Sequence, residues 1–488
     1  MEPLTWTGAL SPLNLVFNTL LLLLLVGIIV SIVLSFVPTA RRPAVNPDGT
    51  LTGGMGLPEL VGTATSYIFM GVIGTILLYL VAGIVMGTSA GILGGMAQQF
   101  VPVWIALAVT FGVSIAYKKR LGLYGKLFDS TVGMIGFGIV MFWVFAGVLG
   151  GLFDLIVTHD SLSQIPGMKN KLPGTPLSGA EPGEFQWYLL GGDNLARDVF
   201  SRLIKGSWIV VLIAPMATVF AFMVGITLGL PAGYYGGRLD TILSFLANLI
   251  LAFPVILLFY LLVTPEIVLT GIPNYMAAVL FVFPVIFAGV LLNSRFYTQP
   301  QVRTPLLIVV LGVLSWAYLS LISSEGYIVK NDDVAVWGLP ALLDWIAMPP
   351  EILVVFVSVV FVNSPTVFRI VRGLALDIKT RDYVAAAQTR GEGPWYIMLW
   401  EILPNARGPL IVDFCLRIGY TTILLGTLGF FGLGLESESP DWGSTINAGR
   451  RLLALYPHAA IAPALALLSL VLGLNLLADG LREESLRD

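Results

Sequence analysis

Residues that usually carry chemistry are scarce in this sequence. It holds two histidines, His159 and His458, and one cysteine, Cys415, which is too few for a cysteine-based metal site or a disulfide framework. The pair Gly125-Lys126 is not a phosphate-binding loop, because no serine or threonine follows the lysine and no glycine stands five residues before Gly125. We therefore expect no catalytic residue, no cofactor and no metal in this chain. An ATP-driven activity would require another chain to bind the nucleotide.

The residue types most able to act on a partner lie in one segment. Six basic and four acidic side chains fall between Arg369 and Arg407, although only 11% of the residues in the chain are charged and 57% are hydrophobic. Elsewhere, Asp413 and Arg417 stand four residues apart, a spacing that favours an ion pair on one helix face over a proton relay. The charged segment is therefore the main candidate site.

Local signals predict that this segment begins with a short helix. Thr380 can cap the helix, and Asp382 in its first turn complements the helix dipole. Val384–Arg390 follows with three alanines, the best helix formers. The alanines give the helix a thin face that can lie deep in a groove of a soluble partner. An ordinary cytoplasmic linker is an equally good interpretation of these residues taken alone.

A turn and a second short helix are predicted next. Gly391 and Gly393 suit a helix end and a tight turn, and Pro394 suits the first position of a helix. That helix should end near Leu403, because Pro404 disfavours helical geometry in the residue before it. An apolar segment follows, so the two short helices are expected between two membrane spans.

The rest of the chain has the composition of a helical membrane protein. Its mean hydropathy is +0.89, and many uncharged stretches are long enough to cross a hydrocarbon layer about 30 Å thick. The run Leu13–Val37 lacks the alternation of a β-barrel strand and is too long for the core of a cleavable signal peptide. The net charge of −3 argues against nucleic-acid binding. We predict an all-α polytopic membrane protein.

Hydropathy predicts eleven membrane spans, or an even number if 274–322 is a re-entrant or differently broken pair. Pro254 is expected to kink the sixth span. The predicted spans are 14–37, 61–86, 99–117, 131–156, 208–232, 241–263, 274–293, 304–322, 350–371, 409–432 and 459–479.

Loop charges place the N-terminus outside and the charged segment in the cytoplasm. In this orientation 17 of the 26 Lys and Arg residues lie inside and 8 lie outside, while Arg417 falls within a span. The outer loop 323–349 carries four acidic residues and a single lysine. Five of the outer basic residues fall in the loop 158–207, and long loops have little weight in this rule.

The charged segment resembles a motif of one transporter family. Tyr383–Ala387 (YVAAA), Gly391 and Ile402–Asn405 (ILPN) resemble the EAA motif of ABC-importer permeases. The following Pro409–Val412 (PLIV) resembles the dipeptide/oligopeptide/nickel subfamily, of which this chain looks like the C-type permease subunit. One position departs from the pattern, because Ala385 stands where the family usually has a glutamate. A salt bridge made by that glutamate is therefore not expected here.

Three further stretches resemble the same subfamily in the same order. Gly191–Arg202 (GGDNLARDVFSR) is similar to GTDxLGRDxxSR, with Ala196 in place of a glycine. Ala232–Asp240 is similar to an AGYxGGxxD turn, and Leu433–Gly443 is similar to the outer loop before the last span of the family. Each match alone is weak, but four collinear matches on the expected sides of the membrane are a strong signal.

The resemblance covers about 131–262 and 349–488, which contain the six spans of a type I ABC-importer permease core. Residues 1–130 add about three spans before this core, and 263–348 insert a helical pair and an outer loop. The coupling segment is 372–408, and an inserted pair keeps it on the inner side. The additions are expected either to face lipid or to contact a partner permease or an accessory subunit.

The resemblance implies a permease subunit of an ATP-driven, binding-protein-dependent importer in the cytoplasmic (inner) membrane of a prokaryote. Its partners would be two ATP-binding cassette ATPase subunits, a second homologous permease, an extracytoplasmic solute-binding protein and the lipid bilayer. The residues implied in ATPase coupling are Arg381, Asp382, Tyr383, Ala385, Ala386, Ala387, Arg390, Gly391, Leu403 and Pro404. The residues expected on the outer face, for contact with the binding protein or for loop structure alone, are Asp193, Arg197, Asp198 and Trp442.

Two other functions fit the sequence less well. An ion-coupled secondary transporter acting without an ATPase would use ionisable residues inside its spans, and these are scarce. A membrane-embedded enzyme would need more reactive groups than two histidines and one cysteine, and both histidines are expected to be solvated in outer loops. The resemblance makes peptides the leading solute, with nickel chelates, opines or oligosaccharides as alternatives.

Overall fold

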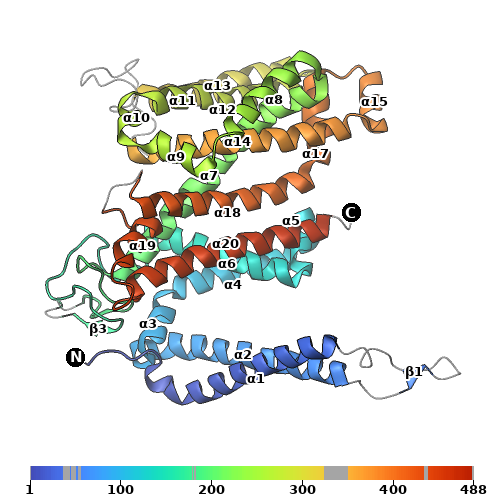
Figure 1. The fold of residues 1–488 in the computed structure, drawn as a ribbon. Coiled ribbons are helices and arrows are strands. Elements are labelled where there is room, and N and C mark those ends of the chain that lie inside the picture. Colours follow the sequence, from blue (N-terminus) through green and yellow to red (C-terminus); the bar gives the residue numbers. More distant parts are fainter. Residues whose placement is uncertain are drawn as a thin grey trace. The chain divides into compact units, whose positions relative to one another are not determined.

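The computed structural model describes residues 2–36, 44–45, 51–52, 57–177, 180, 183–323, 350–433 and 438–485. The chain divides into two compact units, which we describe separately (Figure 1). Unit 1 holds Met1–Trp104 and Thr158–Phe200, and unit 2 holds Ile105–Val157 and Ser201–Asp488. The division into four sequence segments at 130, 262 and 348 stays a prediction.

Unit 1 is a long helical hairpin with a loop-rich segment. The hairpin pairs α1 with α2, and the Tyr79 hydroxyl donates across it to Asn14 Oδ1 at 2.7 Å. A 3₁₀ turn, Gly87–Ala90, joins α2 to α3. Strand pairs β1–β2 and β3–β4 are antiparallel. The elements are α1 (Ser11–Ser35), β1 (Ala44–Val45), β2 (Leu51–Thr52), α2 (Leu57–Met86), α3 (Gly91–Gln99), β3 (Thr175–Pro176), β4 (Trp187–Tyr188), and the starts of α4 (Val101–Tyr117) and α7 (Val199–Tyr235).

The regular elements among the described residues of unit 2 are helices. The long ones are the greater part of α4, α6 (Thr131–Ala146), which a π-helical turn extends to Leu152, the greater part of α7, α12 (Val282–Arg295), α13 (Pro300–Ser323), α14 (Pro350–Ile378), α18 (Arg407–Phe431) and α20 (His458–Ser485). The shorter ones are α5 (Gly122–Lys126), α8 (Gly237–Leu251), α9 (Val255–Val263), α10 (Pro265–Leu269), α11 (Ile272–Leu280), α15 (Asp382–Thr389), α16 (Pro394–Tyr396), α17 (Leu403–Asn405) and α19 (Trp442–Arg450).

The span prediction is confirmed. Ten helices among the described residues are long and apolar enough to cross a membrane, and the bent pair α8–α9 makes eleven if it forms one span. The two parts of that pair meet at 81°, and Pro254 caps the second part, so the predicted kink is present. Within 274–322, residues 275–295 and 300–318 each form a separate helix long and apolar enough to cross a membrane, which favours two ordinary spans there over a re-entrant or differently broken pair.

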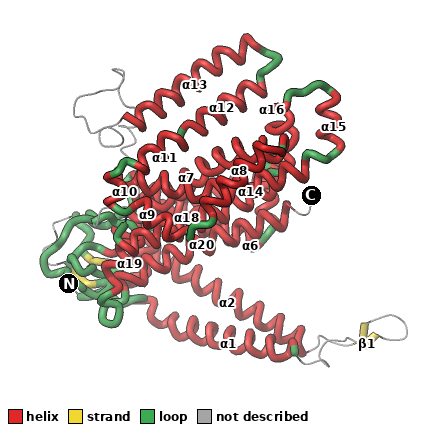
Figure 2. The backbone as a smooth tube through the Cα atoms, turned by 45° about the horizontal axis from the view of Figure 1, so that its top comes forward, coloured by secondary structure: helices red, strands yellow, loops and turns green. Residues whose placement is uncertain are grey.

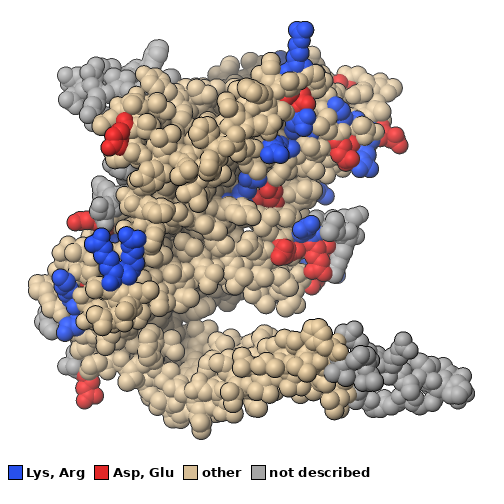
Figure 3. All heavy atoms as spheres, viewed as in Figure 1, with Lys and Arg blue, Asp and Glu red and all other residues tan. Residues whose placement is uncertain are grey.

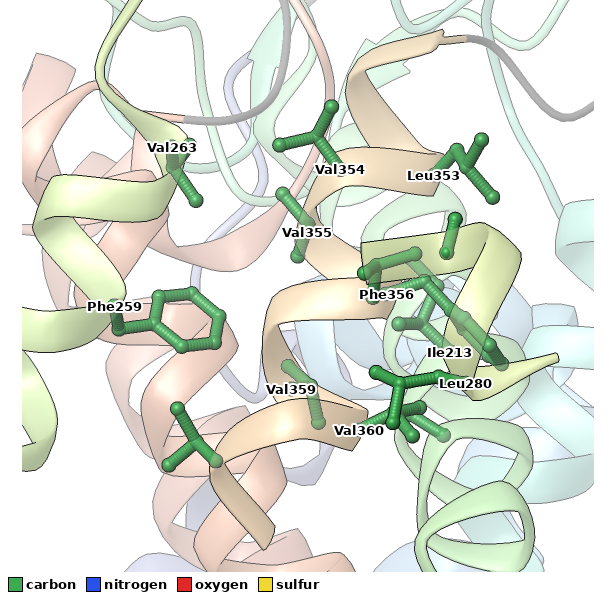
Figure 4. Close-up of a cluster of buried hydrophobic side chains, with 14 of the residues drawn as sticks. Ile213, Phe259, Val263, Leu280, Leu353, Val354, Val355, Phe356, Val359 and Val360 are labelled. Atoms are coloured by element: carbon green, nitrogen blue, oxygen red, sulfur yellow. The ribbon is translucent and has the colours of Figure 1, made fainter. Parts of the chain in front are cut away.

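The core of unit 2 surrounds α14. Its residues from Leu353 to Val362 are buried on every face except at Phe361, as expected for a helix that is apolar all round. Figure 4 shows Phe259 of α9 pointing toward this helix, with Ile213 of α7 and Leu280 of α11 packed beside Phe356. Because lipid gives no hydrophobic driving force between spans, this interdigitated packing supplies the attraction that holds them together.

The two ends of unit 2 carry its charges. In Figure 1, α5 and α15 lie at one end and α10 and α19 at the other. On the face shown in Figure 3, Lys, Arg, Asp and Glu side chains gather around α15, and a separate group lies near α19. Lys126 of α5 and the basic residues of the charged segment therefore share one end, as the predicted orientation requires.

Candidate functional site

The first helix of the charged segment forms where it was predicted, but with a different cap. α15 starts after Arg381, whose extended backbone makes it the N-cap without a side-chain hydrogen bond. The Thr380 hydroxyl instead donates to the Asp377 carbonyl at 2.9 Å, so the prediction that Thr380 caps the helix is wrong. The physical reason is that the end of α14 offers this hydroxyl a free carbonyl acceptor one turn back. Arg381 pairs with Asp377 at 3.1 Å.

The alanines of α15 divide between two faces. Ala387 and Val384 are fully buried within the chain, whereas Tyr383, Ala385 and Ala386 are exposed. The predicted contact role of Ala387 is therefore corrected, because its methyl group packs inward against the chain's own core. The surface left for a partner consists of the side that carries Tyr383, Ala385 and Ala386, and Asp382 is exposed beside it.

The turn after α15 has the predicted geometry. Gly391 adopts φ +80°, a left-handed conformation that ends a helix and favours glycine. Pro394 occupies the start of α16. An ion pair closes the turn, because Arg390 Nη2 donates to Glu401 Oε1 at 2.8 Å. Gly391 and Arg390 are both exposed.

The second helix ends at Asn405, two residues beyond the predicted end near Leu403, because Leu403 does not leave helical geometry as expected. α16 continues as a π-helical turn, Ile397–Ile402, into α17, and Leu403 keeps right-handed helical angles (φ −60°, ψ −41°). Pro404 is accommodated because the wider turn before it relieves the clash between the proline ring and the preceding carbonyls. Ala406 follows α17 and is the N-cap of α18. Leu403 is half-buried and Pro404 is exposed.

Buried apolar side chains hold the coupling segment on its own chain. Val384 and Ala387 of α15 share one cluster with Ile397, Met398 and Ile402 of the π-turn. Residues from α7 and α14, including Leu230, Val371 and Ala375, complete this cluster. Close packing of this kind allows little independent movement. The exposed face of α15 is therefore presented on a rigid base.

The glycine-rich loop at 233–237 is joined to this base. Lys379 Nζ donates to the Gly233 carbonyl at 2.8 Å, and Gln388 Nε2 donates to the Tyr234 hydroxyl at 3.2 Å. Arg372 forms a two-pronged ion pair with Asp240, in which Nη2 donates to Oδ2 at 2.6 Å. The stretch Gly233–Gly237 was expected to be more often a plain turn than a contact. It thus binds the residues that lead from α14 into α15. Its Gly-Gly pair and following aspartate were visible in the sequence, but their basic partners lie more than a hundred residues away.

The charged residues expected on the outer face of unit 1 are buried. Asp193 and Arg197 are each 2% exposed, and Asp198 is 0% exposed. Arg197 Nε donates to Asp193 Oδ2 at 2.7 Å, and Asp193 Oδ1 accepts from the backbone amides of Leu195 and Arg197. These residues therefore organise their own loop, which favours the expected role in loop structure over contact of their side chains with a binding protein. A buried carboxylate needs hydrogen-bond donors close by to replace the water that it has lost. Donors in the same loop can be supplied with the least loss of conformational entropy.

Trp442 is also buried rather than available to a partner. Its ring is 1% exposed, and Nε1 donates to the Leu203 carbonyl at 2.9 Å. The expected outer-face contact is therefore corrected to a packing role within unit 2. The neighbouring Asp441 caps α19 by accepting from the Ser444 amide at 2.9 Å. Part of the sequence match here, residues 434–437, lies outside the described residues.

His159 is not solvated as expected but lies in the interior of unit 1. Its Nδ1 is 3.3 Å from Asp198 Oδ2, and its Nε2 is 2.8 Å from the Phe185 carbonyl. Burial lowers the pKa of His159, but the hydrogen bond and charge of Asp198, the Phe185 carbonyl and the charge of Glu184 together outweigh it. The net pKa is therefore raised above the ordinary value. His458, at the start of α20, is half-buried rather than fully exposed.

The raised pKa predicts that the loop region of unit 1 loses stability as the pH rises. Folded protein holds the proton on His159 more tightly than unfolded protein does, so this stabilisation is complete below the unfolded pKa of about 6.5. It disappears as the pH passes the higher folded pKa. Hydrogen exchange of 158–198 in detergent should therefore accelerate with pH beyond its intrinsic rate. His159→Gln should remove the excess acceleration, and an unchanged profile in this variant would contradict the assignment.

Two further patterns resolve as structural features. Arg417 Nε donates to Asp413 Oδ2 at 2.6 Å, so the predicted ion pair on one face of α18 is confirmed. The stretch Gly87–Gly91 (GTSAG) has the GxSxG spacing of a nucleophile elbow, which requires a strand before the serine. Here α2 precedes it, and the Ser89 hydroxyl donates to the Met86 carbonyl. Ser89 is exposed, but the stretch lacks the strand-to-helix turn of a nucleophile elbow.

Comparison with known proteins agrees with this arrangement. Residues 225–483, which include the whole coupling segment, match the family described as binding-protein-dependent transport system inner membrane component. The glutathione transport system permease protein GsiD of Pectobacterium atrosepticum is 29% identical over 302 residues, covering 62% of this chain and 72% of that protein. The dipeptide transport system permease protein DppC of Haemophilus influenzae is 27% identical over 312 residues, covering 64% of this chain and 77% of that protein.

A second DppC, from Alkalihalophilus pseudofirmus, is 24% identical over 336 residues, covering 69% of this chain and 80% of that protein. These matches confirm the prediction of an importer permease and do not support an ion-coupled carrier. The family match spans more than half of the sequence. The chain therefore belongs to the family of binding-protein-dependent transport system inner membrane components.

Proposed function

We propose that this chain is one permease subunit of an ATP-driven peptide importer. The observation that carries the proposal is the exposed face of α15, formed by Tyr383, Ala385 and Ala386, on a base of buried side chains. Small side chains let a helix approach a groove closely, so this face suits an ATPase subunit. Peptides are the solute we infer, because relatives are named for dipeptide and glutathione transport.

The complete importer would contain three further kinds of component. Two ATP-binding cassette subunits supply the nucleotide chemistry, a second homologous permease completes the pathway, and an extracytoplasmic binding protein delivers the solute. The cytoplasmic membrane of a prokaryote is the inferred location, with α15 and the C-terminus on the cytoplasmic side. The six-span core of 131–262 and 349–488 would line the pathway with its partner, while 1–130 and 263–348 are additions to it.

The packing indicates how movement of the ATPases would reach the membrane. When two ATPase subunits close on ATP, they displace the helices docked on them as rigid bodies. α15 is joined to α7, α8 and α14 through the Asp240–Arg372 pair, the Lys379–Gly233 hydrogen bond and the buried cluster. A displacement of α15 would therefore move these long helices together. Such a movement exchanges inward and outward access of a central pathway.

Purification from native membranes tests this proposal. A tagged full-length chain is expected to bring down an ATPase, a second permease and, in the presence of peptide, a binding protein. The complex in vesicles should take up labelled peptides only when ATP is supplied on the α15 side. Uptake by the chain alone on a proton or sodium gradient, without nucleotide, would overturn the proposal.

A further inference from the structure

The inserted helix α12 contacts the coupling segment directly. Trp400 Nε1, in the π-turn, donates to Ser294 Oγ at 3.0 Å. The guanidinium carbon of Arg295 lies 4.8 Å from the centroid of the Trp400 ring, within the range of a cation–π interaction. Figure 2 shows the end of α12 beside α16, next to the loop that leads to α15. We call these three residues the α12–Trp400 contact.

Apolar packing extends this contact along α12. Phe287, Val290 and Leu291 pack against the same buried cluster that holds α15 and the π-turn. Ser294 is itself buried, and its hydroxyl also donates to the Leu291 carbonyl at 2.9 Å. One face of α12 therefore packs on the base of the coupling segment. The α12–Trp400 contact fixes the position of α12 along the π-turn.

The inserted hairpin is also anchored away from the coupling segment. α13 packs along α12, and the Tyr318 hydroxyl of α13 donates to the Ala278 carbonyl of α11 at 2.8 Å. α11 in turn packs on α14 in the central core. The hairpin is thus tied to α14 at both ends, so it can resist a rotation of the coupling segment relative to α14.

We propose that α12 is a positioning element of the coupling machinery, and that Ser294 and Arg295 hold Trp400 so that α15 and α14 move as one body. This inference rests on the proposed function of α15. Without the α12–Trp400 contact, the π-turn would deform when an ATPase displaces α15, and α14 would not follow. ATP would then be hydrolysed with less solute moved for each nucleotide. The insertion is therefore more than a lipid-facing addition.

Three substitutions test the contact with one matched control. Arg295→Gln removes the cation, Trp400→Phe removes the indole donor, and Arg295→Lys retains the charge. Arg303→Gln is the control, because Arg303, in the first turn of α13, stacks on Tyr297 instead, at 5.8 Å from the ring centroid. In reconstituted complexes, Arg295→Gln and Trp400→Phe should lower solute moved per ATP by about threefold. Arg295→Lys should retain most of the wild-type ratio of solute moved per ATP. Arg303→Gln should leave this ratio unchanged.

A second measurement does not depend on ATPase partners. Hydrogen exchange of Ile397–Asn405 in the purified chain should accelerate by about threefold in Arg295→Gln and Trp400→Phe, but not in Arg303→Gln. Unchanged exchange and an unchanged transport ratio would overturn the inference, as would equal effects in the control. If the wild-type complex shows no ATP-driven uptake while exchange responds as expected, the proposed function fails and the contact stands as a structural support only.

Discussion

Replacing Ala386 with tryptophan is expected to abolish ATP-driven uptake while the protein still folds and inserts. Ala386 is exposed on α15, whereas its neighbours Val384 and Ala387 face the interior. An indole at this position therefore leaves the chain's own packing intact. It would stand on the face proposed to lie in an ATPase groove, where overpacking costs about 1–3 kcal/mol or more. Loss of docking on this scale disconnects nucleotide hydrolysis from the membrane helices.

The measurement combines uptake, ATPase stimulation and complex assembly in vesicles. Gly391→Asp should give the same loss by another route, because its φ of +80° is strained for any side chain and an added carboxylate alters the exposed turn. Gln299→Trp is the control, since it places the same ring on an exposed turn that is not part of α15. Normal uptake by Ala386→Trp in properly inserted protein would refute the docking role of α15.

Local and short-range features of this protein could be predicted from its sequence. The spans follow from hydropathy, because a bilayer rewards long apolar segments wherever they stand in the chain. The turn at Gly391 and the start of α16 at Pro394 follow from backbone preferences that depend on no distant residue. The bend at Pro254 is of the same kind. These features were predicted correctly since each depends on a few adjacent residues.

The errors have a different physical origin. Burial of Asp193, Asp198 and Trp442 is decided by how their loops fold back, which a linear pattern does not encode. A charged residue in a loop motif looks available to a partner until the donors that surround it are known. Similarly, Pro404 looks like a helix end because a π-turn that accommodates it cannot be seen in composition. The contact of Trp400 with Ser294 joins residues 106 positions apart.

The second large effect is expected at the ion pair between Asp240 and Arg372. Asp240 stands in the first turn of α8, and Arg372 lies near the end of α14 that leads into α15. Their side chains are 18% and 33% exposed, so water compensates only in part if one partner is removed. Asp240→Ala should cost about 1–3 kcal/mol at this joint. Because about 1.4 kcal/mol corresponds to a tenfold change in an equilibrium, uptake is expected to fall by roughly tenfold or more.

The matched control is Arg238→Ala, which removes a charge from an exposed position in the same turn of the chain. It should leave uptake near the wild-type rate. Asp240→Arg should be worse than Asp240→Ala, because two guanidinium groups then face each other. The double variant Asp240→Arg with Arg372→Asp should recover part of the loss by restoring opposite charges. Recovery would show that the ion pair itself matters, and not one residue's contact with something else.

This ion pair gives a sharp test because it separates docking of the ATPase on α15 from transmission of the movement to the membrane helices. It lies at the root of α15 and not on the exposed face, so an ATPase should still bind to Asp240→Ala and hydrolyse ATP. Uptake should fall nonetheless, since the α7–α8 turn would no longer follow the movement of α14. If assembly and uptake fall together, or if Arg238→Ala is equally impaired, the ion pair does not transmit the movement. In that case the buried cluster beneath α15 would have to carry the connection alone.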